Sequence, residues 1–438
     1  MIKLLSTKQA SFVFIVCITV TKGIAQVNPI RPTTDSTKVK VEFSGFIRND
    51  IFFDSRQVIS SRPASQGELL LYPAPVVKDA NGNDINANPS LTILAITSRA
   101  AANITGPKAF GAKTSGVLEG EFYGNLNGNE NVFHLRHAYA KLDWGKSQLL
   151  FGQYWHPLLN PECFPQTEGF SVGIPFVAFA RNPQVRFTRQ LNPQWSLTLA
   201  ALSEIEVFSS AGSATGLALG AAAVSSNYIN NAILPNVHAQ LMYKSKSFLW
   251  GIALDYKSLQ PALKDSLDEK YYSVHTKVNS LSFETYAKLV TKKLVAKTGF
   301  VAGQNLYDMI MLGGYFAYGT HGNITYQPDR VNAAWLDIAG TGKKIVPAIF
   351  VGYTQNMGAT KSGAVASYAR GISIGGNSLD NLWRIAPRCD FISGKFKFGT
   401  EVEMTAAAYG IAGSNGKVTG LTTTAMNTRI LFVTVYAF

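Results

Sequence analysis

The chain has 438 residues and a formal net charge of +13, with 40 Lys and Arg against 27 Asp and Glu. Apolar residues make up 46% of it and charged residues 15%, below the roughly 25% of an average soluble protein. This composition excludes a disordered chain, because there is ample apolar surface to bury, and three cysteines are too few for a disulfide scaffold.

Residues 1–25 have the pattern of a secretory signal peptide. Lys3 and Lys8 precede a short apolar core at 11–20, and small residues follow at the point where a signal peptidase would cut. The core has about ten residues, which is too short for a membrane anchor. We therefore expect an exported protein whose mature chain starts with a short flexible segment, 26–38. Its net charge would be +10, because residues 1–25 hold three lysines and no acid.

Residues 39–438 alternate between apolar and polar side chains with a period of two. In one clear example Phe248, Trp250, Ile252, Leu254 and Tyr256 alternate with Gly251, Ala253, Asp255 and Lys257. No other stretch approaches the ~18 consecutive apolar residues of a transmembrane helix. A closed sheet with lipid outside and water inside reconciles an apolar composition with this alternation, because every backbone group pairs with a neighbouring strand.

Sixteen segments read as strands, which is an even number, as in bacterial outer-membrane barrels. They lie near 39–54, 91–105, 115–124, 131–144, 148–155, 184–190, 195–203, 236–245, 248–257, 280–291, 294–304, 330–338, 344–355, 381–392, 395–408 and 426–438. Short connections alternate with mostly long ones, as tight periplasmic turns alternate with external loops. A soluble β-sandwich has no reason to place its long loops at one end. The predicted fold is all-β, a transmembrane antiparallel β-barrel in a single domain, 39–438.

Two positions bear on this strand map. The chain ends on Phe438 in an alternating strand, which resembles the signal read by the outer-membrane assembly machinery, although a hydrophobic last strand can end in Phe by chance. Pro387 lies in the middle of 381–392, where it removes a donor from the ladder, so we expect a bulge or a register error there.

Several short motifs resemble those of the DcaP-like group of trimeric outer-membrane porins. They are Gly45-Phe46-Ile47-Arg48-Asn49-Asp50, Glu119-Gly120-Glu121-Phe122-Tyr123-Gly124, Leu135-Arg136-His137-Ala138-Tyr139, Leu150-Phe151-Gly152-Gln153-Tyr154-Trp155 and Asn182-Pro183-Gln184-Val185-Arg186. They cover mainly 43–190 and agree with the group in order and spacing. The resemblance implies a sixteen-stranded homotrimer that passes small, often anionic solutes such as dicarboxylates. The group often carries an N-terminal coiled coil, for which 26–38 is too short and too rich in proline.

A sixteen-stranded barrel encloses a water-filled lumen, and an open lumen of that width would leak large solutes. We therefore expect a segment of the chain to fold inward and narrow it. The third external connection, 156–183, has the length and the aromatic and proline content to fold inward as a constriction loop. The alternative is a loop packed on the rim or against a neighbouring subunit.

Alternation also predicts which charges face the lumen, because an arginine on the lipid face costs about 2–4 kcal/mol near the midplane. The predicted pore-lining bases are Arg48, Arg99, Arg136, Arg186, Arg384 and Arg388, and the predicted pore-lining acids are Glu119 and Glu121. Fixed cations in a narrow aqueous pore concentrate anions, whereas arginines paired to Glu119 and Glu121 would brace the wall. We expect modest anion selectivity.

Other patterns are weaker. Residues 79–84 superficially resemble a calcium loop, but the glycine is misplaced for an EF-hand and a plain turn is expected. His134 and His137 are three apart on a predicted strand and should face opposite sides. Cys163 and Cys389 should not meet. We therefore expect no catalytic residues, no metal and no cofactor. No cluster of basic and aromatic residues indicates nucleic acid, and lipopolysaccharide phosphates are the expected outer contact.

The predicted function is an outer-membrane porin, not an enzyme, that lets small hydrophilic and preferentially anionic solutes diffuse passively. Its expected partners are outer-membrane lipid and lipopolysaccharide, small anionic solutes and two further copies in a homotrimer. One alternative is an accessory or structural barrel of a larger uptake or secretion complex. A barrel-borne hydrolase is a third, but it would need a Ser-His-Asp/Asn set that the six scattered histidines do not supply.

Overall fold

The computed structural model describes residues 39–61, 67–124, 129, 131–170, 172–205, 207–212, 223–267 and 269–438. The expected signal peptide, 1–25, and the expected flexible segment, 26–38, lie outside these residues. The domain that starts at Val39 is a closed antiparallel β-barrel.

The barrel has sixteen strand positions. Two strands, β4 and β5, share one of these positions, and both pair with β1. The barrel strands are β1 (Lys40–Asp54), β4 (Ser90–Leu94), β5 (Arg99–Ala109), β6 (Ala112–Glu121), β7 (His134–Asp143), β8 (Ser147–Trp155), β9 (Arg181–Gln190), β10 (Trp195–Leu202), β13 (Asn236–Lys244), β14 (Phe248–Leu259), β17 (Val278–Val290), β18 (Leu294–Gln304), β21 (Arg330–Gly340), β22 (Ile345–Gly358), β24 (Asn377–Ser393), β25 (Phe396–Ile411) and β26 (Thr423–Ala437).

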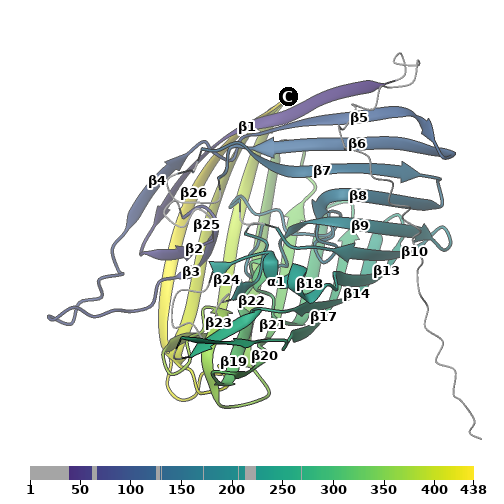
Figure 1. Ribbon diagram of the computed structural model, residues 1–438. Coiled ribbons are helices and arrows are strands. Elements are labelled where there is room, and N and C mark those ends of the chain that lie inside the picture. The colour runs from purple at the N-terminus through teal and green to yellow at the C-terminus, as the bar shows by residue number, and fades with distance from the viewer. Residues whose placement is uncertain are drawn as a thin grey trace, which may run out of the picture. The chain divides into compact units, whose positions relative to one another are not determined.

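The barrel closes where the first strand meets the last (Figure 1). β1 pairs antiparallel with β26 from Phe46 opposite Ala437 to Asp54 opposite Arg429. Beyond the strand, the Phe438 amide donates to the Gly45 carbonyl at 3.1 Å, and the Gly45 amide donates to the Phe438 carbonyl at 3.3 Å. Closure leaves no free edge along this seam, which is the condition for a sheet to cross a membrane.

Every predicted strand is found within a few residues of its expected position, so the barrel prediction is confirmed. One predicted strand, 91–105, is divided into β4 and β5. Its interruption has a polar cause: the Thr97 hydroxyl donates to Asp50 at 2.9 Å, and the Ser98 hydroxyl accepts the Arg48 amide at 3.0 Å. These side chains bond to β1 in place of a continuous ladder.

The two faces of each strand have different chemistry. On β1, Ile47 is 60% exposed on the outer face, whereas Arg48 and Asp50 are buried on the inner face together with Phe52. An apolar exterior around a polar interior is the architecture of outer-membrane barrels, so this protein is an outer-membrane β-barrel. Among the described residues no helix has the length and apolar character to cross a membrane.

The bulge expected at Pro387 is absent. Ile385 pairs with Met404 and Arg388 pairs with Glu401, in one unbroken register on either side of the proline. The ladder to β25 skips Ala386 and Pro387, while Pro387 still lies opposite Ile349 on β22. The strand therefore tolerates the lost donor without inserting a residue, and the one register shift in this pairing lies near Leu379.

The long connections carry additional elements at one end of the barrel. They are β2 (Val58–Ser60), β3 (Leu70–Pro73), β11 (Ala211–Gly212), β12 (Ala223–Val224), α1 (Asn227–Ala232), β15 (Lys264–Leu267), β16 (Lys270–Ser273), η3 (Tyr307–Met309), β19 (Gly313–Thr320), β20 (Asn323–Pro328) and β23 (Ala364–Arg370). Three of these strands form a small sheet in the order β20-β19-β23. Side chains from 69–72, 158–180 and 306–312 join the inner wall in one buried core, so these connections pack into the barrel.

Candidate functional site: the infolded segment and the charged inner wall

The connection between β8 and β9, residues 156–180, crosses the lumen and runs along the opposite wall. The Asn160 amide donates to the Tyr286 hydroxyl on β17 at 2.8 Å. Further on, the Phe164 carbonyl accepts from Lys297 on β18 at 3.1 Å, and the Gln166 amide donates to Asp337 on β21 at 3.2 Å. The segment therefore follows successive strands across the inside of the barrel. The predicted loop, 156–183, extends three residues too far, because β9 begins at Arg181 and not at 184.

Glu168 and Gly169 are held by the far wall. The Glu401 carboxylate on β25 accepts the Glu168 amide at 3.0 Å and the Gly169 amide at 3.1 Å. The Glu168 carboxylate in turn accepts two hydrogen bonds from Lys397, at 2.7 and 2.8 Å. Burial opposes ionisation of Glu168, but the charge of Lys397 outweighs it and lowers the pKa of this carboxyl. Charge-assisted bonds of this kind are stronger than neutral ones.

Small residues on the wall make room for the segment. The ring of Phe176 is fully buried and lies 6.0 Å from the ring of Phe350 on β22. A Cβ added at Gly352 would lie 2.5 Å from the Phe176 ring, and one added at Gly399 would lie 2.2 Å from the Glu168 carboxylate. Both glycines therefore permit close approach of the infolded segment to the strands.

Four of the predicted site residues form one ionic cluster on β5, β6 and β7. Arg136 is buried and donates to Glu119 at 2.7 Å and also to Glu121. Arg99 lies directly opposite Glu121 across the β5–β6 ladder and donates to it at 3.3 Å. Arg99 and Arg136 are therefore paired with carboxylates. These contacts agree with the alternative in which arginines paired to Glu119 and Glu121 brace the barrel wall.

The prediction that His134 and His137 face opposite sides is wrong. The β6–β7 register shifts between Glu119 and Gly120, which inserts one extra residue in β7. As a result His134 lies 3.2 Å from Glu121 and His137 lies 3.3 Å from Glu119, both on the inner face. Because a bulge adds one residue to the strand, side chains three positions apart on either side of it point to the same face.

Three further predicted bases also have acidic partners. Arg48 donates to Asp50 at 2.9 Å and to the Glu168 carbonyl at 2.6 Å. Arg388 binds Asp337 through two hydrogen bonds, at 2.7 and 3.1 Å. Both pairs contact the infolded segment, Arg48 through the Glu168 carbonyl and Asp337 through the Gln166 amide.

Arg384 combines the same two roles. Its guanidinium lies 3.3 Å from Glu403 and donates to the Ile174 carbonyl of the segment at 2.8 Å. It also donates to the carbonyls of Leu70 and Leu71 at 3.2 and 3.1 Å. One buried cation thus ties two long connections to the wall.

Arg186 differs from the other predicted bases. Its guanidinium donates to Gln184 at 2.8 Å and to the Trp155 carbonyl, and it stacks 5.2 Å from the centre of the Tyr154 ring. Among the described residues no carboxylate lies within salt-bridge distance of it. Burial removes water from the Arg186 guanidinium without supplying a negative charge in its place. An anion from solution could therefore bind there.

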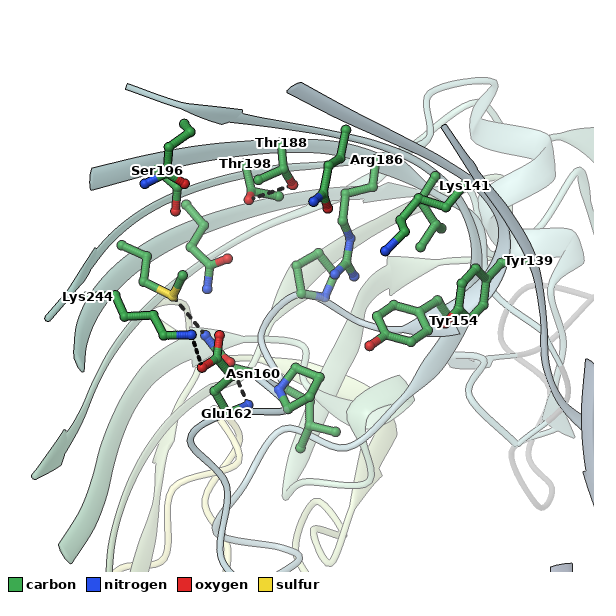
Figure 2. Close-up of a pocket in the computed structure, with 18 of the residues that line it drawn as sticks. Tyr139, Lys141, Tyr154, Asn160, Glu162, Arg186, Thr188, Ser196, Thr198 and Lys244 are labelled. Atoms are coloured by element: carbon green, nitrogen blue, oxygen red, sulfur yellow. Dashed lines mark hydrogen bonds and ion pairs between the residues drawn. The ribbon is translucent and has the colours of Figure 1, made fainter. Parts of the chain in front are cut away.

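Arg186 lines a cavity of about 480 Å³ between the infolded segment and the short-turn end of β7–β10 and β13 (Figure 2). Its charged lining residues are Lys141, Lys146, Glu162, Arg186 and Lys244. Lys244 is paired with Glu162, the one acid of the set, which leaves three cations without an acidic partner in the cavity. The rest of the wall is supplied by hydroxyl, amide and aromatic side chains, among them Thr188, Thr198, Gln240, Tyr139 and Tyr154.

Alternation alone did not single out every charged group of the inner wall. Arg181 is buried at the start of β9, with its guanidinium 5.3 Å from the Trp155 ring and 3.8 Å from Glu121. Arg429 binds Asp54 at 2.8 and 2.9 Å, directly across the β1–β26 seam. The parity of β26 could have indicated Arg429, whereas Arg181 preceded the predicted strand.

A second missed group lies where the infolded segment begins. His156 is buried 3.5 Å from Asp255, which also lies 3.3 Å from His238. Burial lowers the pKa of His156 to about 3 against the opposing charge of Asp255, so the imidazole is neutral at physiological pH. Its Nδ1 accepts the Leu158 amide at 3.2 Å and fixes the first turn of the segment.

The remaining candidate sites are structural. Within the described ranges, no group of three or more His, Cys, Asp or Glu side chains is arranged to hold a metal ion. At 79–84 the Asp79 carboxylate accepts the amides of Asn81 and Asn83, both at 2.8 Å, while Asp84 binds Arg56 at 3.0 Å, so this is a closed turn. Cys163 and Cys389 are both free thiols.

The fold and the charged inner wall define the class as a porin-type barrel of the outer membrane. No protein-family model and no curated protein sequence matches the chain. The chain is similar in structure to the outer membrane channel DcaP of Acinetobacter baumannii, with a TM-score of 0.61 and 15% identity over 92% of this chain and 98% of that one. The resemblance seen in the sequence is thereby confirmed as a likeness of fold.

Two other outer-membrane protein structures are also similar. The anion-selective porin from Comamonas acidovorans matches with a TM-score of 0.52 and 11% identity over 92% of this chain and all of that one. The trimer form of the outer membrane protein OmpT of Vibrio cholerae matches with a TM-score of 0.52 and 8% identity, over the same shares of the two chains. At these identities the similarity is one of fold.

Proposed function

We propose that the protein is a porin through which small hydrophilic, preferentially anionic solutes diffuse passively across the outer membrane. The observation that carries this proposal is Arg186, a largely buried cation without an acidic partner among the described residues, in a cavity with Lys141 and Lys146. A cationic, protein-walled aqueous space raises the local concentration of anions. The infolded segment 156–180 acts as the constriction, because it occupies the lumen opposite this wall.

The five other predicted bases contribute less to selectivity than Arg186. Arg48, Arg99, Arg136, Arg384 and Arg388 each lie beside a carboxylate, and a paired charge produces little field at a distance. Their role in the proposal is to hold the constriction in place and to keep the wall rigid. Selectivity then depends on the cavity side of the lumen, where bases exceed acids.

The test is the reversal potential in a KCl gradient across a planar bilayer. Arg186→Gln should lower the chloride-to-potassium permeability ratio by about a factor of two to three. Arg189→Gln is the matched control, because Arg189 lies on the same strand but is exposed on the outer face and donates to Ser147 at 2.6 Å. A cation-selective wild-type pore, or equal effects of the two substitutions, would overturn the proposal.

The proposed assembly is a homotrimer embedded in outer-membrane lipid and contacting lipopolysaccharide. The support is the fold shared with the trimer form of OmpT. An open trimer would give current steps in threes, and its mass in detergent would be three times that of the chain. Neither nucleic acid nor catalysis is part of the proposed function.

A second candidate, an accessory barrel with a closed lumen, is favoured by one observation. Residues 69–72, 158–180 and 306–312 form a continuous buried core inside the barrel. Single-channel recording separates the two functions, because a closed barrel gives no steps in current whereas a porin conducts.

A further inference from the structure

The short-turn rim of the barrel has a pronounced excess of positive charge. The seven hairpin turns with their flanking residues are 106–114, 143–147, 189–195, 244–248, 290–294, 340–345 and 393–397, and together they hold twelve Lys or Arg and one acid, Asp143. The eight long connections at the other end hold nine Lys or Arg against thirteen acids. The positive net charge of the chain is therefore concentrated at one rim, and every turn of that rim contributes to it.

Most of these cations have no acidic partner among the described residues. Eleven of them are exposed: Lys108, Lys113, Lys146, Arg189, Lys244, Lys246, Lys292, Lys293, Lys343, Lys344 and Lys395. Of these eleven, only Lys244 forms a salt bridge among the described residues, with Glu162. Lys146 and Lys244 line the lumen cavity, so we call the other nine residues the basic collar. Because short turns face the periplasm in outer-membrane barrels, the collar lies at the periplasmic boundary of the membrane.

Each of the seven turns also exposes an apolar side chain within a few residues of its cations. Phe110 is 87% exposed, Leu191 55% and Ile345 56%, and the other four turns are completed by Trp144, Phe248, Leu294 and Phe396. Apolar side chains at the level of cations are typical of a membrane interface, where the apolar part enters the acyl region and the charged end reaches the headgroups. A soluble acidic partner would leave these side chains in water.

The first two turns show how a headgroup would fit. The Trp144 indole donates to the Phe110 carbonyl at 2.9 Å and joins the two turns. Beside this bond lies a recess of about 280 Å³ lined by Lys108, Lys113 and Asp143. Two cations and the Trp144 ring in the lining of this recess, with the exposed Phe110 ring on the adjoining turn, suit a phosphate with an attached acyl chain.

We propose that the basic collar binds anionic phospholipid headgroups of the periplasmic leaflet and fixes the depth of the barrel in the membrane. Each cation near an anionic surface adds about 1 kcal/mol of attraction, which is about a five-fold local enrichment for a single contact. The ligand is a lipid and not free phosphate, because the exposed apolar residues need an acyl chain.

The experiment reconstitutes the full-length barrel in phosphatidylcholine vesicles with a trace of fluorescent phosphatidylglycerol or fluorescent phosphatidylcholine. Energy transfer from tryptophan reports how much of each probe surrounds the protein. We expect a two- to five-fold enrichment of the anionic probe at about 20 mM salt, falling towards one at about 0.5 M as screening shortens the reach of the charges. Equal amounts of the two probes around the wild-type barrel would overturn the proposal.

A four-site substitution tests the collar directly. Lys292→Gln, Lys293→Gln, Lys343→Gln and Lys344→Gln together should remove much of the enrichment. The matched control is Lys264→Gln, Lys270→Gln, Lys361→Gln and Lys417→Gln, four exposed lysines of the long connections that lower the net charge equally. Equal loss in both variants would refute a role for the collar, since it would show an effect of total charge.

Two further readouts keep the result interpretable. Unchanged single-channel conductance and unchanged resistance to unfolding in detergent show that a variant still folds and conducts, so failure of the lipid proposal is distinct from failure of the porin proposal. Soluble polyglutamate serves as a competitor for the other class of partner. If it binds the collar tightly while the lipid probes show no preference, the collar recognises an acidic polymer and the proposal is wrong.

Discussion

Phe176 is the side chain through which the infolded segment is most open to test. Its ring is 0% exposed, and the Arg384 guanidinium lies 5.3 Å from its centre. Truncating a buried Phe to Ala costs about 3–5 kcal/mol. Because 1.4 kcal/mol corresponds to a factor of ten, Phe176→Ala should shift the equilibrium between the packed and the displaced segment by about two to three and a half orders of magnitude. The barrel ladder does not involve this side chain and should remain intact.

The assay is single-channel recording combined with the size limit for polyethylene glycol entry. Phe176→Ala should give larger and noisier currents and admit larger polymers, because the segment leaves the lumen. Phe398→Ala is the matched control, since Phe398 is 55% exposed on the outer face. If Phe176→Ala folds, yet its conductance, its polymer size limit and the protease resistance of 156–180 all stay at wild-type values, the segment does not narrow the pore.

Three other predictions concern the same packing, an external ion pair and the barrel seam. Gly352→Val should displace the segment as Phe176→Ala does, because a Cβ at 352 would lie 2.5 Å from the Phe176 ring, and the double variant should add little to either single one in conductance. Against the effect of burial, contacts with His321 and with the backbone amides of Gly322 and Ser266 lower the pKa of Asp265. The contact between Asp265 and His321 is therefore complete at neutral pH and is lost in acid, as pH falls through the lowered pKa of this carboxyl. Asp265→Asn should therefore expose residues 264–273 to protease at pH 7 as acid does in the wild type. Phe438→Ala should lower the folded fraction recovered in outer membranes about ten-fold, measured by heat-dependent migration in gels, because the ring covers the seam where the barrel closes.

Each of these has a matched control on the same element or in a similar environment. Gly340→Ala places a Cβ at an ordinary 3.4 Å from its neighbour, so it should not alter conductance. Glu269→Gln removes an exposed acid from the β15–β16 region and should leave the protease pattern unchanged at pH 7. Phe432→Ala removes an outward ring, 56% exposed, from the same strand as the seam. If a control matches its test variant, the corresponding contact is not the cause.

The strand map was predictable because lipid contact imposes a strict local rule. In β14 every second residue from Phe248 to Tyr256 is apolar, and the structure pairs this strand along its whole length with β17. The rule holds wherever one face meets hydrocarbon, so it does not depend on which strands are neighbours. It failed at 95–98, where Thr97 and Ser98 bond to β1, because the sequence does not say which strand lies alongside.

The orientation and pairing of the charged residues were also only partly predictable from the sequence. That Arg136 and Glu121 face inward follows from alternation and from the cost of a charge in lipid. That His134 and His137 share their face follows only from a bulge, which depends on pairing between β6 and β7. Likewise, the difference between Arg388, which is paired with Asp337 from two strands away, and Arg186, which has no acidic partner among the described residues, could not be derived from either strand alone.

The amino-acid sequence by itself determined a sixteen-strand outer-membrane barrel, the alternation of short turns with long connections, and the inward orientation of the predicted arginines and glutamates. These are local properties, since each depends on a residue and its immediate neighbours in the chain. Only the tertiary structure decided the path of residues 156–180 across the lumen, the partner of each buried arginine and the gathering around one cavity of three cations that have no acidic partner among the described residues. Such contacts join residues far apart in the chain, such as Glu168 and Glu401, and their geometry is fixed only when the barrel closes.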